Sequence, residues 1–347
     1  MKLEEMVSFQ SVTTFGVGGL ARFVLSGEGE GSVKEAISFS KDKRIPLIVL
    51  GGGSNMLGDD GVSDAVFFKV TSIGVDHLNN EDEIILSAYA GERWDDVVSY
   101  AVGSGFFGFE NLSGIPGNVG GALVQNIGAY GSALSDTVVA VEVFDTQEGI
   151  VRTLTKEECL FGYRTSLFKM HPERFVILRG VFRLKITGAV HTAYKDLYEV
   201  FGDRKPGLLE MRDAILSIRA RKFPDTSKEG TAGSFFKNPI VTEAQAQALK
   251  ARFPDVPLFS VPEEVGVKVP LAWFLDHVMQ LRGFTQGNVR CFESQPLVLV
   301  AKKEAKASEV RAFAALIQKR VLDEIGLSIT PEVSVVNRNI LTSSLTF

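Results

Sequence analysis

The sequence contains very little cysteine and histidine. Two cysteines, Cys159 and Cys291, occur in 347 residues, far apart and outside any CxxC pair. Four histidines are scattered without the short spacings that zinc ligands show. We therefore expect no disulfide framework and no metal site. The scarcity of cysteine favours a reducing compartment, and we expect a cytoplasmic protein.

Long apolar runs and an excess of positive charge are also missing. No run approaches the roughly 18 apolar residues of a membrane span. The first ten residues, MKLEEMVSFQ, carry acids where a secretory signal would be basic and then apolar. The net charge is −5, which argues against broad binding of nucleic acids or anionic membranes. The length predicts two or three domains, because 347 residues exceed what one core usually serves.

Three common motifs of catalysis and nucleotide binding are absent as well. There is no Walker A sequence, no GxSxG and no GxGxxG directly after a strand. Gly16, Gly18 and Ala21 fit GxGxxA by letter, but no clear strand precedes them. A P-loop ATPase, a Rossmann enzyme and a serine hydrolase triad are therefore unsupported.

Strand and helix patterns are present along the whole chain. The predicted strands are 45–50, 64–70, 83–90, 136–145, 175–186, 296–301 and 328–336. The predicted helices are 32–43, 92–102, 207–221, 242–250, 271–281 and 308–325. Thr242 and Gln245 form a capping box, and Gly326 supplies a C-terminal stop.

Glycine is abundant, and the first cluster of it follows the predicted strand 45–50. The cluster reads GGGSN and comprises Gly51, Gly52, Gly53, Ser54 and Asn55. Glycines allow a backbone to turn several N–H groups toward one point, and such a nest binds anions. A structural turn explains this segment equally well.

The second cluster, IPGNVGGALVQNIGAYG, spans residues 115–131. A tight bend would explain two glycines but not five, so the pattern favours contact with a flat ligand or a diphosphate. Two such clusters outside a Rossmann frame indicate a large cofactor with two negative charges, held along its length. The five glycines are Gly117, Gly120, Gly121, Gly128 and Gly131.

Four side chains stand out as candidates for catalysis, and each also has an ordinary explanation. Ser234, in GTAGSFFKNP, also suits a turn. Arg164, in FGYRTSLFK, would be a surface residue beside buried aromatics, and would lie opposite Tyr163 if the segment is a strand. Lys222 ends a predicted helix, where a cation complements the dipole. Glu332, in ITPEVSVV, also suits a solvated strand face. The patterns alone leave these alternatives open.

Taken together in order, the segments resemble the UDP-N-acetylenolpyruvoylglucosamine reductase (MurB) family, flavoenzymes of peptidoglycan precursor synthesis. The resemblance covers nearly the whole chain. The matching segments are TTFGVGGLA (13–21), GGGSNML (51–57), AGERW (90–94), GFENLSGIPGNVGGALVQNIGAYG (108–131), FGYRTSLFK (161–169), RARKFPD (219–225), GTAGSFFKNP (230–239) and TPEV (330–333).

The resemblance implies an α+β protein with an FAD-binding fold of the vanillyl-alcohol-oxidase (PCMH-like) type. It has two α+β FAD-binding subdomains, at 1–69 and 70–223, and a C-terminal α+β substrate domain at 224–327. Residues 328–347 would return a strand to the active site and end in a tail. FGYR (161–164) and Tyr194 in HTAYKDL (191–197) resemble the longer family type, in which a loop carrying this tyrosine folds over the substrate nucleotide. A cytoplasmic monomer is expected, without nucleic-acid or membrane partners.

The implied reaction uses NADPH to reduce FAD and then passes hydride from flavin N5 to the enol ether of UDP-N-acetylglucosamine enolpyruvate. The product is UDP-N-acetylmuramate. Negative charge on the substrate would be stabilised by Arg164 and Glu332, and Ser234 would donate the proton. Phe235 and Phe236 would help to exclude water.

The resemblance also assigns binding residues. For the substrate these are Tyr194, Lys222, Asn238 and Gln295. For FAD they are Gly51, Gly52, Gly53, Ser54, Asn55, Ile115, Pro116, Gly117, Gly120, Gly121, Asn126, Gly128, Ala129, Tyr130 and Arg219.

The chain departs from the family pattern at two positions. Ser334 stands where a basic residue is expected, and Phe292 where a histidine is common, so substrate contacts at these two positions are expected to differ from the family pattern. Lys237 and the tail after Val336 have no assigned role. Two alternatives are an FAD-dependent alcohol oxidase of the same fold and a non-catalytic flavin- or UDP-sugar-binding protein.

Overall fold

The computed structural model describes residues 1–260, 266–337 and 340–342. These residues form two compact units, each built from separate stretches of the chain. Unit 1 comprises residues 1–7, 21–53 and 64–220, and unit 2 comprises 8–20, 54–63 and the chain from 221 onward. The predicted domain boundaries at 69, 223 and 327 stay predictions.

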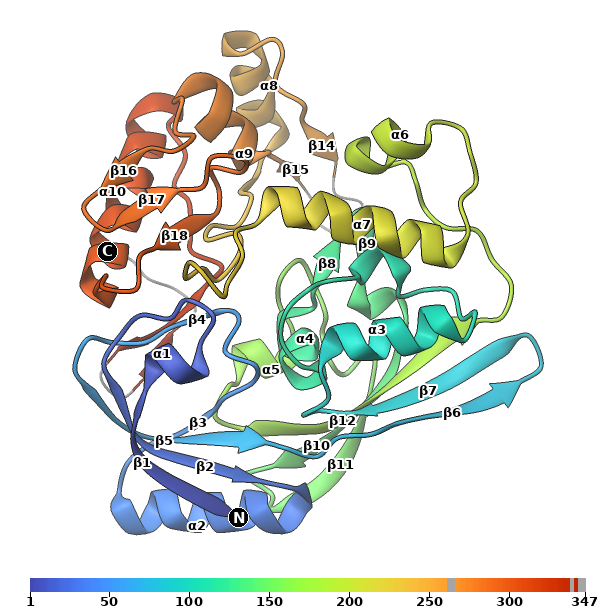
Figure 1. Ribbon diagram of the computed structural model, residues 1–347, viewed down its shortest axis with the longest axis vertical. Helices are drawn as coiled ribbons and strands as arrows, with labels where there is room; N and C mark the ends of the chain where they lie inside the picture. Colours follow the sequence, from blue (N-terminus) through green and yellow to red (C-terminus); the bar gives the residue numbers. More distant parts are fainter. Residues whose placement is uncertain (261–265, 338–339, 343–347) are drawn as a thin grey trace. The chain divides into compact units, whose positions relative to one another are not determined.

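Unit 1 contains two sheets and a small hairpin (Figure 1). One sheet has the strand order β1-β2-β5-β3, the other β11-β10-β12-β7-β6, and β8 pairs with β9. The strands are β1 (Lys2–Ser8), β2 (Leu20–Gly27), β3 (Leu47–Val49), β5 (Val62–Val70), β6 (Val75–Asn80), β7 (Glu83–Tyr89), β8 (Gly128–Ala129), β9 (Ser132–Ala133), β10 (Val138–Asp145), β11 (Ile150–Thr155) and β12 (Phe175–Lys185).

The strands predicted from alternation and apolar runs are confirmed in unit 1. β12 pairs antiparallel with both β10 and β7, and its apolar residues alternate with Arg179 and Arg183 in the second half of the strand. The middle of β5, residues 65–68, is apolar and fully buried. β3 pairs parallel with β5, and a parallel pair with both faces covered reads as a continuous apolar run.

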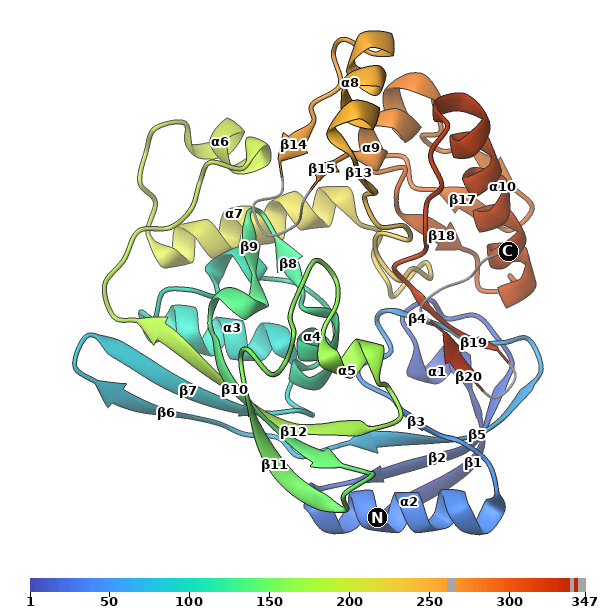
Figure 2. The ribbon, with the colours of Figure 1, turned by 180° about the vertical axis from the view of Figure 1, so that it is seen from behind.

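The helices of unit 1 place their apolar faces inward. α2 contacts β3 and β12, and α4 contacts β7 and β12 (Figure 2). The residues predicted to line the inner faces of α3 and α7 are buried, so both predicted helices are confirmed. The helices are α2 (Gly29–Lys43), α3 (Trp94–Gly103), α4 (Val119–Gln125), α5 (Leu167–Met170), α6 (Lys195–Phe201) and α7 (Leu208–Lys222), with short 3-10 turns at Glu110–Leu112 and Leu134–Asp136.

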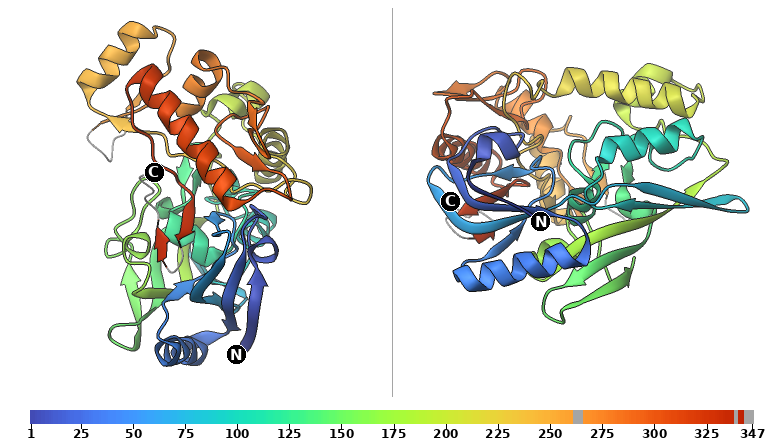
Figure 3. Two further views of the ribbon diagram at one scale, coloured as in Figure 1. Left: turned by 90° about the vertical axis from the view of Figure 1, so that its left-hand side faces the viewer. Right: turned by 60° about the horizontal axis from the view of Figure 1, so that its bottom comes forward.

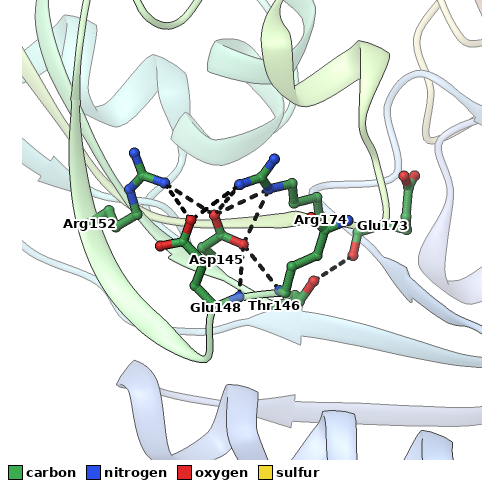
Figure 4. A network of polar contacts seen from close by, with 7 residues as sticks. Asp145, Thr146, Glu148, Arg152, Glu173 and Arg174 are labelled. Atoms are coloured by element: carbon green, nitrogen blue, oxygen red, sulfur yellow. Dashed lines mark hydrogen bonds and ion pairs between the residues drawn. The ribbon is translucent and has the colours of Figure 1, made fainter.

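A buried carboxylate lies at the end of β10. Asp145 has no exposed side-chain surface, and Arg174 contacts it through Nε and Nη2, the latter at 2.8 Å (Figure 4). Arg152 approaches from the other side at 3.4 Å. The hydrogen bond from Arg174, opposed by burial, lowers the pKa of Asp145. The ion pairs therefore hold the β10–β11 turn against the segment before β12.

Unit 2 packs its helices on short strands. α10 lies against β17 (Figure 3). Its buried stripe includes Val310, Phe313, Ile317 and Val321, as the spacing predicts. The elements are α1 (Phe9–Val12), β4 (Met56–Leu57), β13 (Ile240–Val241), α8 (Glu243–Arg252), β14 (Phe259–Ser260), β15 (Val267–Lys268), α9 (Leu271–Trp273), a π turn (Phe274–Val278), β16 (Thr285–Gln286), β17 (Val289–Cys291), β18 (Leu299–Ala301), α10 (Ala307–Ile325), β19 (Ser334–Asn337) and β20 (Ile340–Thr342).

Three expectations for unit 2 were wrong in extent. The helix predicted at 271–281 is one short α turn that continues as a π turn. The strand predicted at 296–301 begins at Leu299. The strand predicted at 328–336 begins only at Ser334, so Glu332 precedes it. In each case part of the apolar run is buried without forming a regular helix or a hydrogen-bonded strand ladder. Apolar periodicity reports burial, and it does not distinguish a regular element from an irregular buried segment.

In the part of the chain that the structure describes, no helix is both long enough and apolar enough to cross a membrane.

Candidate functional site

The two glycine clusters meet in unit 1. A Cβ on Gly52 would lie 2.7 Å from the Cα of Gly117, and a Cβ on Gly51 would lie 3.0 Å from Asn118 Oδ1. Among Gly51–Gly53, only Gly53 has a left-handed φ, of 67°. The first two glycines are therefore required for close approach of the main chains, and not for the positive φ that a nest of turns would need.

A helix that the sequence reading missed runs through the second cluster. Asn118 caps α4 by accepting a hydrogen bond of 2.9 Å from Gly121 N–H. Val119 N–H donates to Glu92 O and Gly120 N–H to Ala90 O. These three N–H groups are thereby satisfied within the protein, so they are not available as donors to a phosphate. Asn is a preferred capping residue, and Asn118 was the signal that could have revealed this helix.

Arg219 and Tyr130 lie next to this loop. Arg219, on α7, donates a 2.9 Å hydrogen bond from Nε to Gly114 O. It also hydrogen-bonds to the hydroxyl of Tyr130, and burial lowers the pKa of its guanidinium. Burial raises the pKa of Tyr130 to about 12, despite the nearby Arg219 charge. Tyr130 is therefore a neutral phenol beside a cation at physiological pH.

Tyr194 packs on the same cluster. Its ring meets that of Tyr130 edge to face, with centroids 5.5 Å apart and an interplanar angle of 86°. The residue occupies the N-cap position of α6 without a side-chain capping bond, and it remains 47% exposed. Burial of the hydroxyl and the charge of Asp196 raise its pKa. A half-exposed, neutral phenol on a loop is suited to hydrogen bonding with a ligand.

Arg164 lies in a tight turn and not in a strand. Its φ is 54°, in the left-handed region, and Gly162 and Thr165 form an isolated bridge around it. Because the segment is not extended, the alternation that would place Tyr163 and Arg164 on opposite faces does not apply. The guanidinium donates a 2.6 Å hydrogen bond to Gly128 O.

Asn126 supports this turn from the end of α4. Its side-chain Nδ2 donates to Gly162 O at 3.0 Å, and its Oδ1 accepts from Ser135 N–H at 3.0 Å. Its own φ of 42° ends the helix. The geometry thus gives Asn126 a part in holding the Arg164 turn, beside the cofactor contact that the resemblance implies.

Ser234 and Glu332 are brought together in unit 2. Glu332 N–H donates a 2.7 Å hydrogen bond to Phe235 O, and Lys237 N–H donates to Thr330 O at 3.0 Å. The Glu332 carbonyl accepts from Asn55 Nδ2 at 3.2 Å. The serine segment, the end of the first glycine cluster and the acid therefore share one hydrogen-bonded network.

The serine segment is also joined to the loop that contains Gln295. Phe235 N–H donates to Leu297 O at 2.9 Å, and Val298 N–H donates to Gln295 O at 3.0 Å. Phe235 and Phe236 are buried, with ring centroids 5.1 Å apart. Both rings belong to the hydrophobic core of unit 2, next in sequence to the partly buried Ser234, and their role in excluding water from a site stays a prediction.

The remaining assigned residues take varied positions. Asn238 Oδ1 accepts a 2.9 Å hydrogen bond from Leu271 N–H, so it holds the start of α9. Lys222 is the partly buried last residue of α7. Ile115 packs against the core of unit 1, and Ala129 against the cluster around Tyr130. Ser54 and Pro116 make further contacts within the protein.

Unit 1 thus carries Tyr130, Tyr194, Arg164, Arg219, the whole second glycine cluster, and the first cluster as far as Gly53. Unit 2 carries Ser54, Asn55, the serine segment and Glu332. No group of three or more His, Cys, Asp or Glu residues suited to a metal ion occurs within the described ranges.

Two family models match the chain. An FAD binding domain matches residues 21–155, and the C-terminal domain of UDP-N-acetylenolpyruvoylglucosamine reductase matches residues 225–336. The predicted α+β FAD-binding fold is therefore confirmed, and FAD is the cofactor that the fold accommodates.

Curated relatives extend the similarity over nearly the full length. UDP-N-acetylenolpyruvoylglucosamine reductase of Pseudomonas aeruginosa is 38% identical over 96% of this chain and 98% of its own. That of Flavobacterium johnsoniae is 32% identical over 97% of this chain and 100% of its own. A crystal structure of UDP-N-acetylenolpyruvylglucosamine reductase (MurB) from Thermus caldophilus has a TM-score of 0.68 at 24% identity, covering 97% and 100% of the two chains, and shows the same fold.

Proposed function

Because the chain belongs to the UDP-N-acetylenolpyruvoylglucosamine reductase family, we propose that it reduces UDP-N-acetylglucosamine enolpyruvate to UDP-N-acetylmuramate, with FAD as cofactor and NADPH as co-substrate. This reaction belongs to peptidoglycan precursor synthesis. The observation that supports the proposal is the hydrogen bond between Phe235 O and Glu332 N–H, because it joins the backbone next to Ser234 to the backbone of Glu332 within the matched reductase domain.

The glycine clusters fit a large flat cofactor. Gly51 and Gly52 let one main chain lie directly on Gly117 and Asn118, where any side chain would enter the space between them. Arg219 adds a cation with a neighbouring neutral phenol, Tyr130. When bound, FAD supplies hydride to the substrate. The protein residues orient the cofactor, balance its charge and exclude water.

Ser234 is proposed as the proton donor to the substrate carbon. An alcohol is a weak acid, so it can serve only toward a strongly basic partner in a site that excludes water. We propose that Phe235 and Phe236, both buried, contribute to that exclusion. Arg164 and Glu332 are proposed to stabilise the negative charge that develops on the substrate carboxylate. Arg164 is pre-oriented by its bond to Gly128 O, which limits the reorganisation needed during the reaction.

Four residues are proposed to bind the nucleotide part of the substrate. Tyr194 would close over it from its exposed loop, and Lys222 would neutralise phosphate charge. Asn238 has its Oδ1 engaged with Leu271 N–H, which directs the amide Nδ2 to act as the donor. Gln295 lies in the loop that is hydrogen-bonded to the serine segment through Leu297 O.

The domain boundaries at 69, 223 and 327 remain our proposal, with the FAD-binding subdomains first and the substrate domain after them. We also propose that the protein works as a cytoplasmic monomer. Support comes from its two buried, unpaired thiols, Cys159 and Cys291, which suit a reducing compartment. Size-exclusion chromatography with light scattering would test the oligomeric state.

The decisive experiment separates the two half-reactions by stopped-flow absorbance of the flavin. In Ser234→Ala, reduction by NADPH should proceed at the wild-type rate, because the serine takes no part in it. Reoxidation by the enolpyruvyl substrate should slow by about 10²–10⁴-fold, the usual size of a general-acid contribution. Ser328→Ala, an exposed serine of the same unit, is the matched control and should match the wild type in both.

Equal loss in both half-reactions would contradict the role of Ser234. Rapid reoxidation by air with peroxide formation, without turnover of the enolpyruvyl sugar, would favour an alcohol oxidase. Bound flavin without NADPH consumption would favour a non-catalytic binding protein.

A further inference from the structure

Asp95, on α3, stands at the centre of a compact polar network in unit 1 that the resemblance did not assign. Its carboxylate accepts two hydrogen bonds from Arg212 on α7, at 2.7 and 2.8 Å, in the fork geometry of a bidentate pair. The side chains of Arg212 and Asp95 are only 13% and 27% exposed, so water competes weakly for this pair.

The same carboxylate also binds a backbone group. Asp95 Oδ1 accepts a hydrogen bond of 2.6 Å from Gly114 N–H. On the other side of this residue, Arg219 Nε donates to Gly114 O at 2.9 Å. Gly114 is therefore held through its N–H by α3 and through its C=O by α7.

Gly114 cannot be replaced by another residue without strain. Its φ of 70° is left-handed, and a Cβ would lie 2.8 Å from Leu216 Cδ2 and 3.1 Å from Arg219 Cδ. The backbone passes directly beneath α7 at this point. The network thus fixes both the path of the main chain and the stem of the Arg219 side chain.

The held residue immediately precedes the loop that meets the first glycine cluster. Residues 115–117 follow it, and Gly117 is the residue on which Gly52 packs. Gly114 and Gly117 are three residues apart, and consecutive Cα atoms are held about 3.8 Å apart. A shift of Gly114 therefore also moves Gly117 and disturbs the contact between the two glycine clusters.

We propose that Asp95 and Arg212 are positioning residues for the FAD-binding loop 114–117 and for Arg219. Neither needs to touch the cofactor: the pair holds the loop in the conformation that FAD binds. This inference rests on the proposed function, since it takes loop 114–117 and Arg219 as cofactor contacts.

The electrostatics support a permanently charged pair. Burial opposes ionisation of Asp95, but hydrogen bonds from Arg212 and Gly114, together with the Arg212 and Arg219 charges, outweigh it and lower the pKa of the carboxyl. The hydrogen bonds that Arg212 donates to Asp95 raise the pKa of Arg212. The nearby charges of Asp213 and Asp96 also favour the charged form of Arg212.

The test is FAD binding by the full-length protein with Asp95→Asn, which removes the charge at nearly constant shape. Loss of a hydrogen bond to a charged group predicts a Kd for FAD about tenfold higher than in the wild type. The matched control is Asp64→Asn, which breaks the exposed pair between Asp64 and Arg22 in the same unit and should leave the Kd unchanged. Flavin fluorescence on titration and on release reports both affinities.

Thermal unfolding separates positioning from a purely structural role. A structural role would lower the midpoint of the FAD-free and FAD-saturated proteins equally. A positioning role also shrinks the increase in midpoint that saturating FAD produces, because that increase depends on affinity. Arg212→Lys keeps the charge but loses the bidentate contact, and it should show the same effect with a smaller size. This variant serves as the test if Asp95→Asn does not fold.

A Kd within about twofold of the wild type in Asp95→Asn, or in Arg212→Lys if that variant alone folds, would overturn the inference, as would an unchanged FAD-dependent rise in midpoint. If the wild-type protein and Asp64→Asn both fail to bind FAD, the proposed function and this inference fall together, which is distinct from loss in the Asp95 variant alone.

Discussion

Gly52→Ala is the substitution that tests most directly whether the two glycine clusters need close main-chain contact. The added Cβ would lie 2.7 Å from Gly117 Cα, 3.1 Å from Gly117 C and 3.3 Å from Asn118 N, all of them backbone atoms. Ordinary contacts of a Cβ begin at 3.4 Å, so one of the two segments must move by 3.4 − 2.7 = 0.7 Å. No flexible side chain is available to move instead.

Overpacking of this kind costs about 1–3 kcal/mol. In a domain of this size each kcal/mol lowers the unfolding midpoint by roughly 2–4 °C. We therefore expect the FAD-free Gly52→Ala protein to unfold about 2–12 °C below the wild type. Because the displaced segments belong to the proposed cofactor cradle, the purified protein should also contain less FAD per chain, measured by absorbance.

Gly31→Ala provides the matched control for this substitution. Gly31 lies in α2, and a Cβ there would meet nothing within 4 Å. Replacing a glycine inside a helix should stabilise the protein by about 0.5–1 kcal/mol. If Gly52→Ala unfolds within 1 °C of the wild type and retains full FAD, the close-approach reasoning is refuted.

Two further predictions concern buried ionisable groups. Asp145→Asn should destabilise the protein by about 1–3 kcal/mol, because Arg174 and Arg152 lose the charge that they share, and a thermal midpoint unchanged at pH 7 would contradict this. Since the folded pKa of Asp145 is lowered from its ordinary 3.8, its stabilisation is present above that pH and is lost as pH falls below it, so the difference between Asp145→Asn and wild type should shrink in acid. Burial raises the pKa values of Cys159 and Cys291 to about 12, so neither thiol should react with a disulfide reagent at pH 8 until the protein is unfolded; fast reaction of the native protein would show otherwise.

Much of this molecule follows from local sequence. The apolar faces of α3, α7 and α10 have helical spacing, and the main strands of unit 1 have apolar runs or alternation, so each element carries its own signal. The capping box of Thr242 and Gln245 is complete, and Gly326 ends α10 with a φ of 70°. The ordered motifs also identified the family, because their residues are legible without coordinates.

The hydrogen-bonded networks around Glu332 and around Asp95 could not be derived from local sequence. Asn55 and Glu332 are 277 residues apart, and Asp95 and Arg212 are 117 apart. An isolated Asp on a helix looks like any solvated acid, and its meaning comes from the groups that folding brings to it. Asp95 was missed for that reason.

Sequence alone determined the elements, the family and the residue types available for chemistry, because these depend on neighbours along the chain. Tertiary structure decided how those residues are held. It placed Arg164 in a left-handed turn, set Glu332 ahead of its strand beside Phe235, and used Gly51 and Gly52 for contact with the second cluster. These outcomes depend on which distant main chains come within hydrogen-bonding or van der Waals distance, and no local pattern records that.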